Sequence, residues 1–287
     1  MVNGLDAGPR MVPIHPRETL KLEPKALPHT FQQSGAGQLA DAAGAGLSLL
    51  FQAGTRPGAQ DVARLIESSH AAGLLARVSH MPEPEEGWLE LLASGLTFDM
   101  RGLAPARPAP VTAPGYKFGF EDKDGTDGVF EAVELLPSGH IAAGGRLQPV
   151  LRTMMGLAAD LALNLPVAGV AWGPAQTLME PRYFSRMVLS WLSGGAFPAL
   201  GLTALVRGTD GSIASQGLAH FTGQEMQIEG RAGENPADTV KLAIRVVDHL
   251  VRQGRIAEPL RIGTGPGALL LEPSQVGKLV LVWREAL

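Results

Sequence analysis

Histidine is the residue type in this sequence that would most directly supply acid–base or metal chemistry. The seven histidines are His15, His29, His70, His80, His140, His220 and His249. None of them forms a His-x-x-x-His, His-Glu-x-x-His or His-x-His spacing, so the sequence contains no local metal motif. His220 is the strongest single candidate, because it lies at the end of an expected strand in Ala219-His-Phe-Thr-Gly223. A hydrogen-bonded histidine that closes a strand and a member of a binding site both fit this position.

Carboxylates are the second source of acid–base chemistry, and Glu225 and Glu229 are the most notable pair. Their spacing of four residues places both on one face of either a helix or a strand. No acid–base partner is evident near them, although segments that are distant in the sequence can assemble one. The acidic stretch 83–86 is broken by Pro84, which is typical of a solvated surface.

Two glycine-containing loops invite a ligand-binding interpretation and fail the motif that each resembles. Gly263-Thr-Gly-Pro-Gly267 lacks the Gly-Lys-Ser/Thr ending and the following helix of a phosphate-binding loop, which leaves a turn or a weaker anion site. In the stretch 122–128 a calcium loop would need glycine at position six and glutamate at position twelve, and the sequence has Asp127 and Val133 there. We expect a solvated loop at 122–128.

Nucleophile chemistry has little support. The chain has no cysteine, which excludes disulfides, thiolate metal sites and a cysteine nucleophile. No Gly-x-Ser-x-Gly elbow occurs. The formal charge is 24 − 28 = −4 and the pI is about 6.0, so the sequence does not have the basic character of a nucleic-acid binder. We therefore expect no catalytic residue that the sequence can name, no metal or other cofactor, and no nucleic-acid partner.

The composition of the 287 residues indicates many turns between short elements. There are 36 glycines and 22 prolines, and 45% of the residues are hydrophobic, enough for a large core. Residues 1–45 have no regular periodicity and no signal-peptide pattern, so we expect an extended or partly disordered arm. No run of about 18 apolar residues occurs, which predicts a cytoplasmic protein without a membrane span. The abundance of arginine and alanine is typical of a bacterial source.

The first half of the ordered region is predicted as one α+β block, 46–104, followed by a linker and loop, 105–128. Its expected strands are 47–51, 74–78 and 96–100, with a helix that begins near Asp61 and stops at Gly73. A short amphipathic turn is expected through Trp88. Alternating prolines after Leu103 remove strand hydrogen-bond donors and predict a stiff linker.

Residues 129–287 are predicted as a second α+β block. Its expected elements are a hairpin of 129–136 and 140–143, helices from 147 to about 165, from 181 to 193 and from 236 to 253, and strands at 167–172, 201–206, 213–221, 224–229, 260–262, 268–271 and 279–283. Asn235 as N-cap, Pro236 at the first helical position and Gly254 after the end mark the last helix. Helices that alternate with hairpins favour an α+β fold, and we expect ferredoxin-like split β-α-β units, either single or duplicated, in an α/β sandwich.

The C-terminal third, residues 205–285, resembles a bacterial family, the domain of unknown function family 4261. The residues that carry the resemblance are His220-Phe-Thr-Gly223, Met226-Gln-Ile-Glu229, Pro236, Val246 to Gly254, and Ile262-Gly263. The second half of the family's strand motif is only loosely reproduced. The family has no established activity, and the resemblance implies a connection with bacterial secretion or toxin–immunity systems.

These observations favour a non-catalytic protein-interaction module, an adaptor or immunity-type protein with another protein as its partner. The alternative is a small-ligand-binding protein or an enzyme whose site is assembled between the α+β blocks. A self-assembling subunit is a third possibility. The candidate binding residues are Trp172, Arg182, Tyr183, His220, Thr222, Glu225 and Glu229.

Overall fold

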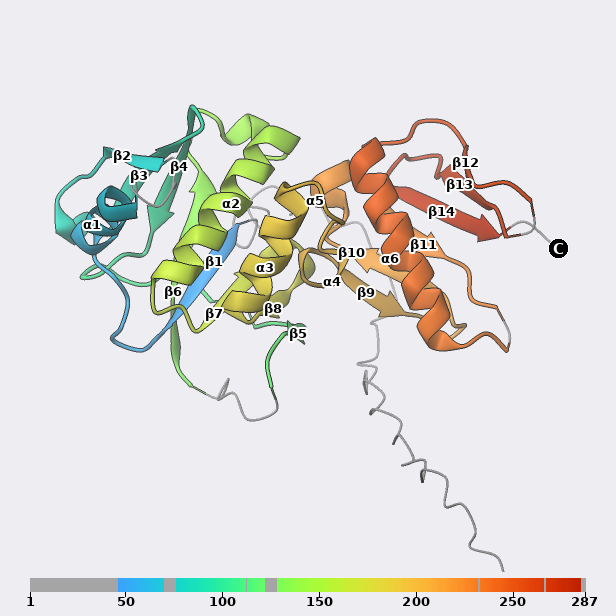
Figure 1. Cartoon of the computed structure of the whole chain (residues 1–287), viewed down its shortest axis with the longest axis horizontal. Helices are drawn as coiled ribbons and strands as arrows, with labels where there is room; N and C mark the ends of the chain where they lie inside the picture. Colours follow the sequence, from blue (N-terminus) through green and yellow to red (C-terminus); the bar gives the residue numbers. More distant parts are fainter. Residues whose placement is uncertain are drawn as a thin grey trace, which may run out of the picture. The chain divides into compact units, whose positions relative to one another are not determined.

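The described part of the chain folds into two mixed β-sheets and six α-helices, so the fold belongs to the α+β class (Figure 1). The structure, a computed structural model, describes residues 46–69, 76–111, 113–121, 128–231, 233–265 and 267–284. These residues belong to one unit that spans 35–287. The expected N-terminal arm, residues 1–45, lies outside the described residues, as do the expected helix stop at Gly73 and most of the loop 122–128.

The first sheet has eight strands in the order β2-β3-β4-β6-β1-β7-β8-β5. The strands are β1 (Leu47–Gln52), β2 (Ala76–His80), β3 (Trp88–Ala93), β4 (Leu96–Arg101), β5 (Tyr116–Phe118), β6 (Phe130–Pro137), β7 (Gly169–Trp172) and β8 (Thr177–Met179). All neighbours pair antiparallel except β5 and β8. Strand β6 pairs with β1 and with β4, so residues 105–128 connect strands of a single sheet.

The second sheet has six strands in the order β12-β13-β14-β11-β10-β9. The strands are β9 (Ala204–Arg207), β10 (Ile213–Gln216), β11 (Glu225–Ile228), β12 (Leu260–Ile262), β13 (Leu269–Pro273) and β14 (Leu279–Arg284). The pair β11 and β14 is parallel, and the other pairs are antiparallel. The ferredoxin-like arrangement that the sequence predicts is not confirmed for either sheet.

The helices cover one face of each sheet. They are α1 (Ala59–Ser69), α2 (Gln148–Asn164), α3 (Pro181–Leu192), α4 (Ala199–Leu202), α5 (Ala219–Thr222) and α6 (Pro236–Gln253), with short 3-10 turns at η2 (Pro84–Glu86), η3 (Ala142–Gly144) and η4 (Gly173–Ala175). Helices α1, α2 and α3 lie over the first sheet, and α6 lies over the second (Figure 1). The apolar stripes of these helices and the inward residues of the strands form one large core.

A small second core lies on the other face of the first sheet. Leu50, Ala132 and Leu178 are buried there, and Ala109 and Phe120 pack against them. The last two belong to the proline-rich connection between β4 and β6. This connection therefore covers part of the sheet face that no α-helix of the described residues covers.

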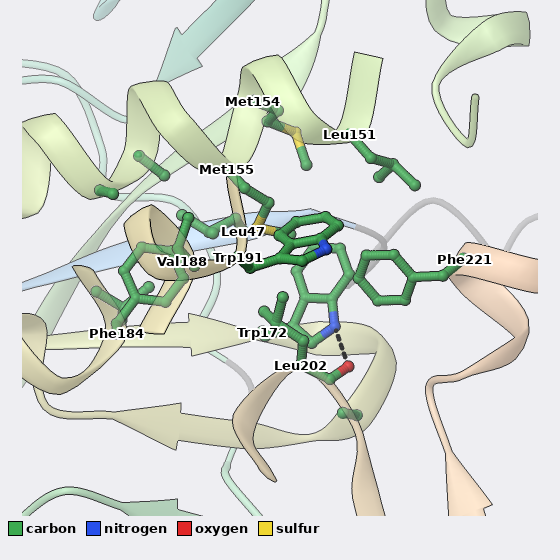
Figure 2. Packing of buried hydrophobic residues seen from close by; sticks show 14 of the residues in the cluster. Leu47, Leu151, Met154, Met155, Trp172, Phe184, Val188, Trp191, Leu202 and Phe221 are labelled. Carbon is green, nitrogen blue, oxygen red and sulfur yellow. Dashed lines mark hydrogen bonds between the residues drawn. The ribbon is translucent and has the colours of Figure 1, made fainter. Parts of the chain in front are cut away.

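An aromatic cluster joins the end of β7 to α3 and to α5, the short helix between β10 and β11 (Figure 2). Trp172 is fully buried, and its indole N–H donates to the Leu202 carbonyl oxygen at 3.0 Å. The Phe221 ring lies 5.8 Å from Trp172 and 6.4 Å from Trp191, measured between ring centroids. The Phe197 ring lies 4.9 Å from Phe221 in an edge-on arrangement, which is a favourable aromatic geometry.

Most of the elements expected from the sequence are confirmed, but the expected linker and loop 105–128 contains strand β5, the expected strand 201–206 begins only at Ala204, and three further expectations are wrong. Residues Trp88–Ala93 form strand β3 and not an amphipathic turn. The second strand of the expected hairpin at 140–143 is a set of turns that includes η3. The expected strand 213–221 ends at Gln216, and its remainder forms α5, which contains His220.

Capping explains why α6 begins where the sequence predicts. The Asn235 side-chain oxygen accepts a hydrogen bond from the Ala237 N–H at 3.0 Å, and Pro236 occupies the first helical position. We expect Asn235→Ala to lower the free energy of unfolding by about 1 kcal/mol, because the Ala237 N–H loses its acceptor. Urea unfolding monitored by circular dichroism measures this, and an unchanged midpoint would contradict the role of the cap.

Candidate functional site

His220 belongs to the aromatic cluster at the junction. Its ring lies edge-on to the Trp172 ring, with centroids 4.9 Å apart and planes at 84°. Burial, and to a smaller extent the positive charge of Arg146, together lower the pKa of His220 from 6.5 to about 4. The imidazole is therefore neutral at pH 7 and packs as an aromatic ring between α5 and the end of β7.

Glu225 is occupied by hydrogen bonds within its own segment. Its carboxylate accepts from the backbone N–H groups of Gly217 at 2.8 Å, Leu218 at 3.2 Å and Ala219 at 3.1 Å. It also accepts from the Ser215 hydroxyl. These donors surround the start of α5, where backbone N–H groups have no partner inside the helix. The carboxylate thus organises the connection between β10 and β11.

Thr222 and Glu229 complete the C-terminal group of candidates. The Thr222 hydroxyl donates to the Gln224 carbonyl oxygen at 2.8 Å and accepts from the Gln224 N–H at 3.1 Å, so it closes the turn after α5. Glu229 follows the end of β11 and is exposed. Thr222 therefore has a local structural role, and the Glu229 carboxylate faces solvent.

Arg182 and Tyr183 lie in the first turn of α3. The Glu180 carboxylate caps this helix by accepting from the backbone N–H groups of both residues, at 3.0 Å and 2.6 Å. The Tyr183 hydroxyl donates to the Leu200 carbonyl oxygen at 3.0 Å, and burial raises the pKa of this phenol. The Arg182 side chain is exposed and lines a surface depression of about 400 Å³.

The structure thus brings Trp172 and His220 together and places the other candidates elsewhere. None of the other six candidates lines the depression beside Arg182. Glu225 and Thr222 are used within the β10–β11 connection. The glycine-rich loop that begins at Gly263 connects two antiparallel strands, β12 and β13, and no helix begins after it.

Sequence reasoning missed a polar network on the first sheet that involves three adjacent strands. Ser79 of β2 donates to the Glu90 carboxylate of β3 at 2.7 Å. The Thr97 hydroxyl of β4 lies 2.6 Å from Nε2 of His140, and the Glu90 carboxylate lies 4.0 Å from the same nitrogen. A nucleophile–histidine–carboxylate relay needs the carboxylate on the other ring nitrogen, so this arrangement does not match one. The alternation of Thr97 and Asp99 with apolar residues in β4 is the signal that could have located the network.

The second sheet carries apolar residues on the face opposite α6. Along β14, Leu279, Leu281 and Trp283 alternate with the buried Val280 and Val282. Leu270 pairs directly with Trp283. Val206 lies in the same cross-strand row as Leu281, with Ala214 and Gln227 between them. We call this set, Val206, Leu270, Leu279, Leu281 and Trp283, the open face.

None of the open-face side chains packs against the two apolar cores of the described residues. The Trp283 residue is 37% exposed, although tryptophan is among the most hydrophobic side chains. Glu272 pairs with Leu281 and therefore lies on the same side of the sheet, and the exposed Glu229 follows the neighbouring strand. Arg261 pairs with Leu270 and lies on this side as well, so the open face is an apolar strip with two acidic residues and one basic residue beside it.

No group of three or more histidine, aspartate or glutamate side chains in the described residues is arranged to hold a metal ion. None of their helices combines the length and the hydropathy that crossing a bilayer requires.

No protein-family model, no curated protein and no solved structure matches this chain. The resemblance of residues 205–285 to the domain of unknown function family 4261 stays a prediction.

Proposed function

We propose that this protein is a non-catalytic protein-interaction module that binds a partner protein through the open face of its second sheet. The single observation that carries the proposal is the row of apolar side chains on a sheet face that packs against neither core. An antiparallel sheet with one face in water normally shows polar residues on that face. Apolar residues on both faces are typical of a sheet that is covered on both sides.

The opposite face of the same sheet indicates what the missing layer looks like. There the 18-residue helix α6 places Val247 and Leu250 against the sheet, and Met226 and Val280 are fully buried beneath it. A helix packed on the open face would bury Leu281 and Trp283 in the same way. Burial of apolar area contributes about 25 cal/mol per Å², so such a strip can supply the main driving force for association.

The charges beside the strip select among helices. Two carboxylates, Glu229 and Glu272, and one guanidinium, Arg261, lie next to the apolar residues, so the net charge there is negative and a complementary helix has an apolar stripe flanked by more lysine and arginine than acidic residues. The proposed partner is therefore a protein that presents a basic amphipathic helix. An adaptor that recognises such a helix needs no catalytic residue and no cofactor. A link to bacterial secretion or toxin–immunity systems is compatible with this role and rests on the family resemblance alone.

Photo-crosslinking in the native cells tests the proposal. Leu281 is replaced by p-benzoylphenylalanine in one chain, and the exposed Arg245 of α6 is replaced in a control chain. We expect one discrete crosslinked protein at position 281 and none at position 245. Mass spectrometry of the crosslinked peptide is expected to identify a helical segment with basic flanks. Equal adducts at the two positions, or an adduct with a second copy of this chain, would contradict the proposal.

Replacing Trp283 by glutamate tests the energetic contribution of the strip. We expect Trp283→Glu to weaken partner binding by about thirtyfold or more, because central aromatic residues dominate interface energies and a carboxylate within the apolar strip would lose its hydration on binding. The stability of the isolated chain is expected to change by less than about 1 kcal/mol, since the residue is partly exposed. Isothermal titration with the crosslinked partner and urea unfolding measure the two effects. Unchanged affinity would remove the open face from the interface.

A further inference from the structure

A second surface feature lies on the first sheet's side of the molecule, where α2 ends and α3 begins. The depression beside Arg182 has a volume of about 400 Å³, which is within the usual range for small-molecule pockets. Most of the residues that line it have apolar side chains, among them Phe120, Leu163, Leu165, Val167 and Pro181, although polar atoms contribute the larger part of the lining surface. Leu163 is 50% exposed, so an apolar surface is available to a ligand at this position.

Backbone hydrogen bonds hold the walls in place. The turn after α2 is closed by the Val167 N–H, which donates to the Leu165 carbonyl oxygen at 2.8 Å. The Ala168 N–H donates to Leu50 of β1 at 2.7 Å, and the Glu180 N–H donates to Phe118 of β5 at 2.9 Å. Because the walls are anchored to sheet strands, the depression exists before a ligand binds, which reduces the ordering cost of binding.

The two charged residues that line the depression differ in what they can still bind. The Glu180 carboxylate already accepts two backbone N–H groups and lies at the positive end of the α3 dipole. The Arg182 guanidinium forms no ion pair with any acid in the described part of the chain, and its side chain is exposed. The available charge at this site is therefore a single guanidinium beside the apolar side chains of the lining.

We propose that this depression binds a small monocarboxylate with an apolar body. The carboxylate pairs with the planar fork of Arg182, whose geometry suits two parallel hydrogen bonds. The apolar body covers Leu163, Leu165 and Val167. A phosphate dianion would need more donors than one guanidinium supplies, and an amine would find its counter-charge, Glu180, already used.

Titration with three matched six-carbon compounds tests the charge and the apolar requirements separately. Hexanoate, hexan-1-ol and hexylamine are added to the full-length chain, and binding is followed by NMR chemical-shift changes. We expect hexanoate to bind, hexan-1-ol to bind at least tenfold more weakly, and hexylamine not to bind. Hexan-1-ol binding as tightly as hexanoate, or no hexanoate binding at millimolar concentration, would overturn the proposal.

Variants assign the effect to this site. Arg182→Gln is expected to weaken hexanoate binding at least tenfold and to leave hexan-1-ol binding unchanged. The matched control is Arg186→Gln, one turn further along α3, where the guanidinium lies 5.9 Å from the Tyr183 ring centroid. This control is expected to bind hexanoate as the unmodified chain does. Equal losses in the two variants would show general attraction to a basic surface and would contradict the assignment.

A rim variant and an open-face variant complete the test. Leu163→Gln is expected to weaken both hexanoate and hexan-1-ol, and folding of this half-exposed position is checked by its thermal unfolding midpoint. Hexanoate binding that is unaffected by Leu163→Gln would overturn the proposed placement of the apolar body. Trp283→Glu is expected to leave hexanoate binding unchanged, because the open face and the depression are independent sites. The two proposals therefore succeed or fail separately.

Discussion

Glu225→Gln is expected to lower the free energy of unfolding by about 3 kcal/mol. The carboxylate accepts three backbone N–H groups and one hydroxyl, and hydrogen bonds to charged groups contribute about 1.5–3 kcal/mol each. Glutamine keeps the shape of the side chain but turns one oxygen into a donor, which then faces N–H groups that also donate. Urea unfolding followed by tryptophan fluorescence measures the loss.

Glu229→Gln is the matched control, since this glutamate is exposed and four residues away on the same segment. We expect it to change the stability by less than about 0.5 kcal/mol. Equal effects of the two substitutions would mean that the Glu225 hydrogen bonds contribute little, and the carboxylate would again be a candidate for ligand binding. The comparison therefore separates a structural role of Glu225 from a binding role.

The stability of the protein is expected to rise with pH between about 4 and 6.5, and His220 is expected to account for much of the rise. The pKa of His220 is about 4 in the folded chain and 6.5 for the ordinary side chain, because burial and then Arg146 disfavour the charged ring. Between these values the unfolded chain binds more protons than the folded chain, so the free energy of unfolding increases with pH. The contribution of this one residue is about 3 kcal/mol across the window.

Replacement by phenylalanine isolates this contribution. His220→Phe keeps an aromatic ring beside Trp172 and removes the titrating group, so the slope of stability against pH is expected to flatten in this window. His140→Gln is the control, because the His140 side chain is 64% exposed, and its slope is expected to match that of the unmodified chain. Burial raises the pKa of Glu134 and of Asp160, which acts in the opposite direction and is common to all three proteins. An unchanged slope in His220→Phe would contradict the prediction.

These two predictions assign structural roles to residues that sequence reasoning placed in a candidate site. Both roles depend on contacts that no local pattern reveals. Glu225 meets the start of α5 because β10 and β11 pair antiparallel and turn the chain back on itself. His220 meets Trp172 because the helical turn at 219–222 directs it toward the end of β7, whereas a continued strand would have placed it on one face of the second sheet.

The elements that were predicted correctly share strong local signals. Helix α6 has an N-cap, a proline at its first position and a glycine after its end, and α3 begins at Pro181 as its spacing indicates. The elements that were missed have none of these signals. Strand β3 follows a proline-broken acidic stretch, and its apolar residues at 89, 91 and 92 fit a helical turn as well as a strand.

The sequence by itself determined the α+β class, most helix ends and the absence of cysteine chemistry, because periodicity, capping and composition act over a few neighbouring residues. Only the tertiary structure decided which residues remain available to bind. The alternation in β14 predicts two faces but not which one a helix covers, since that depends on where α6 packs after a connection of many residues. In the same way, the exposed state of Arg182 depends on Glu180 and on the end of α2, which meet only when the sheet has formed. Whether a side chain is free to bind depends on contacts between segments that are distant in the sequence, and no pattern within one segment predicts those contacts.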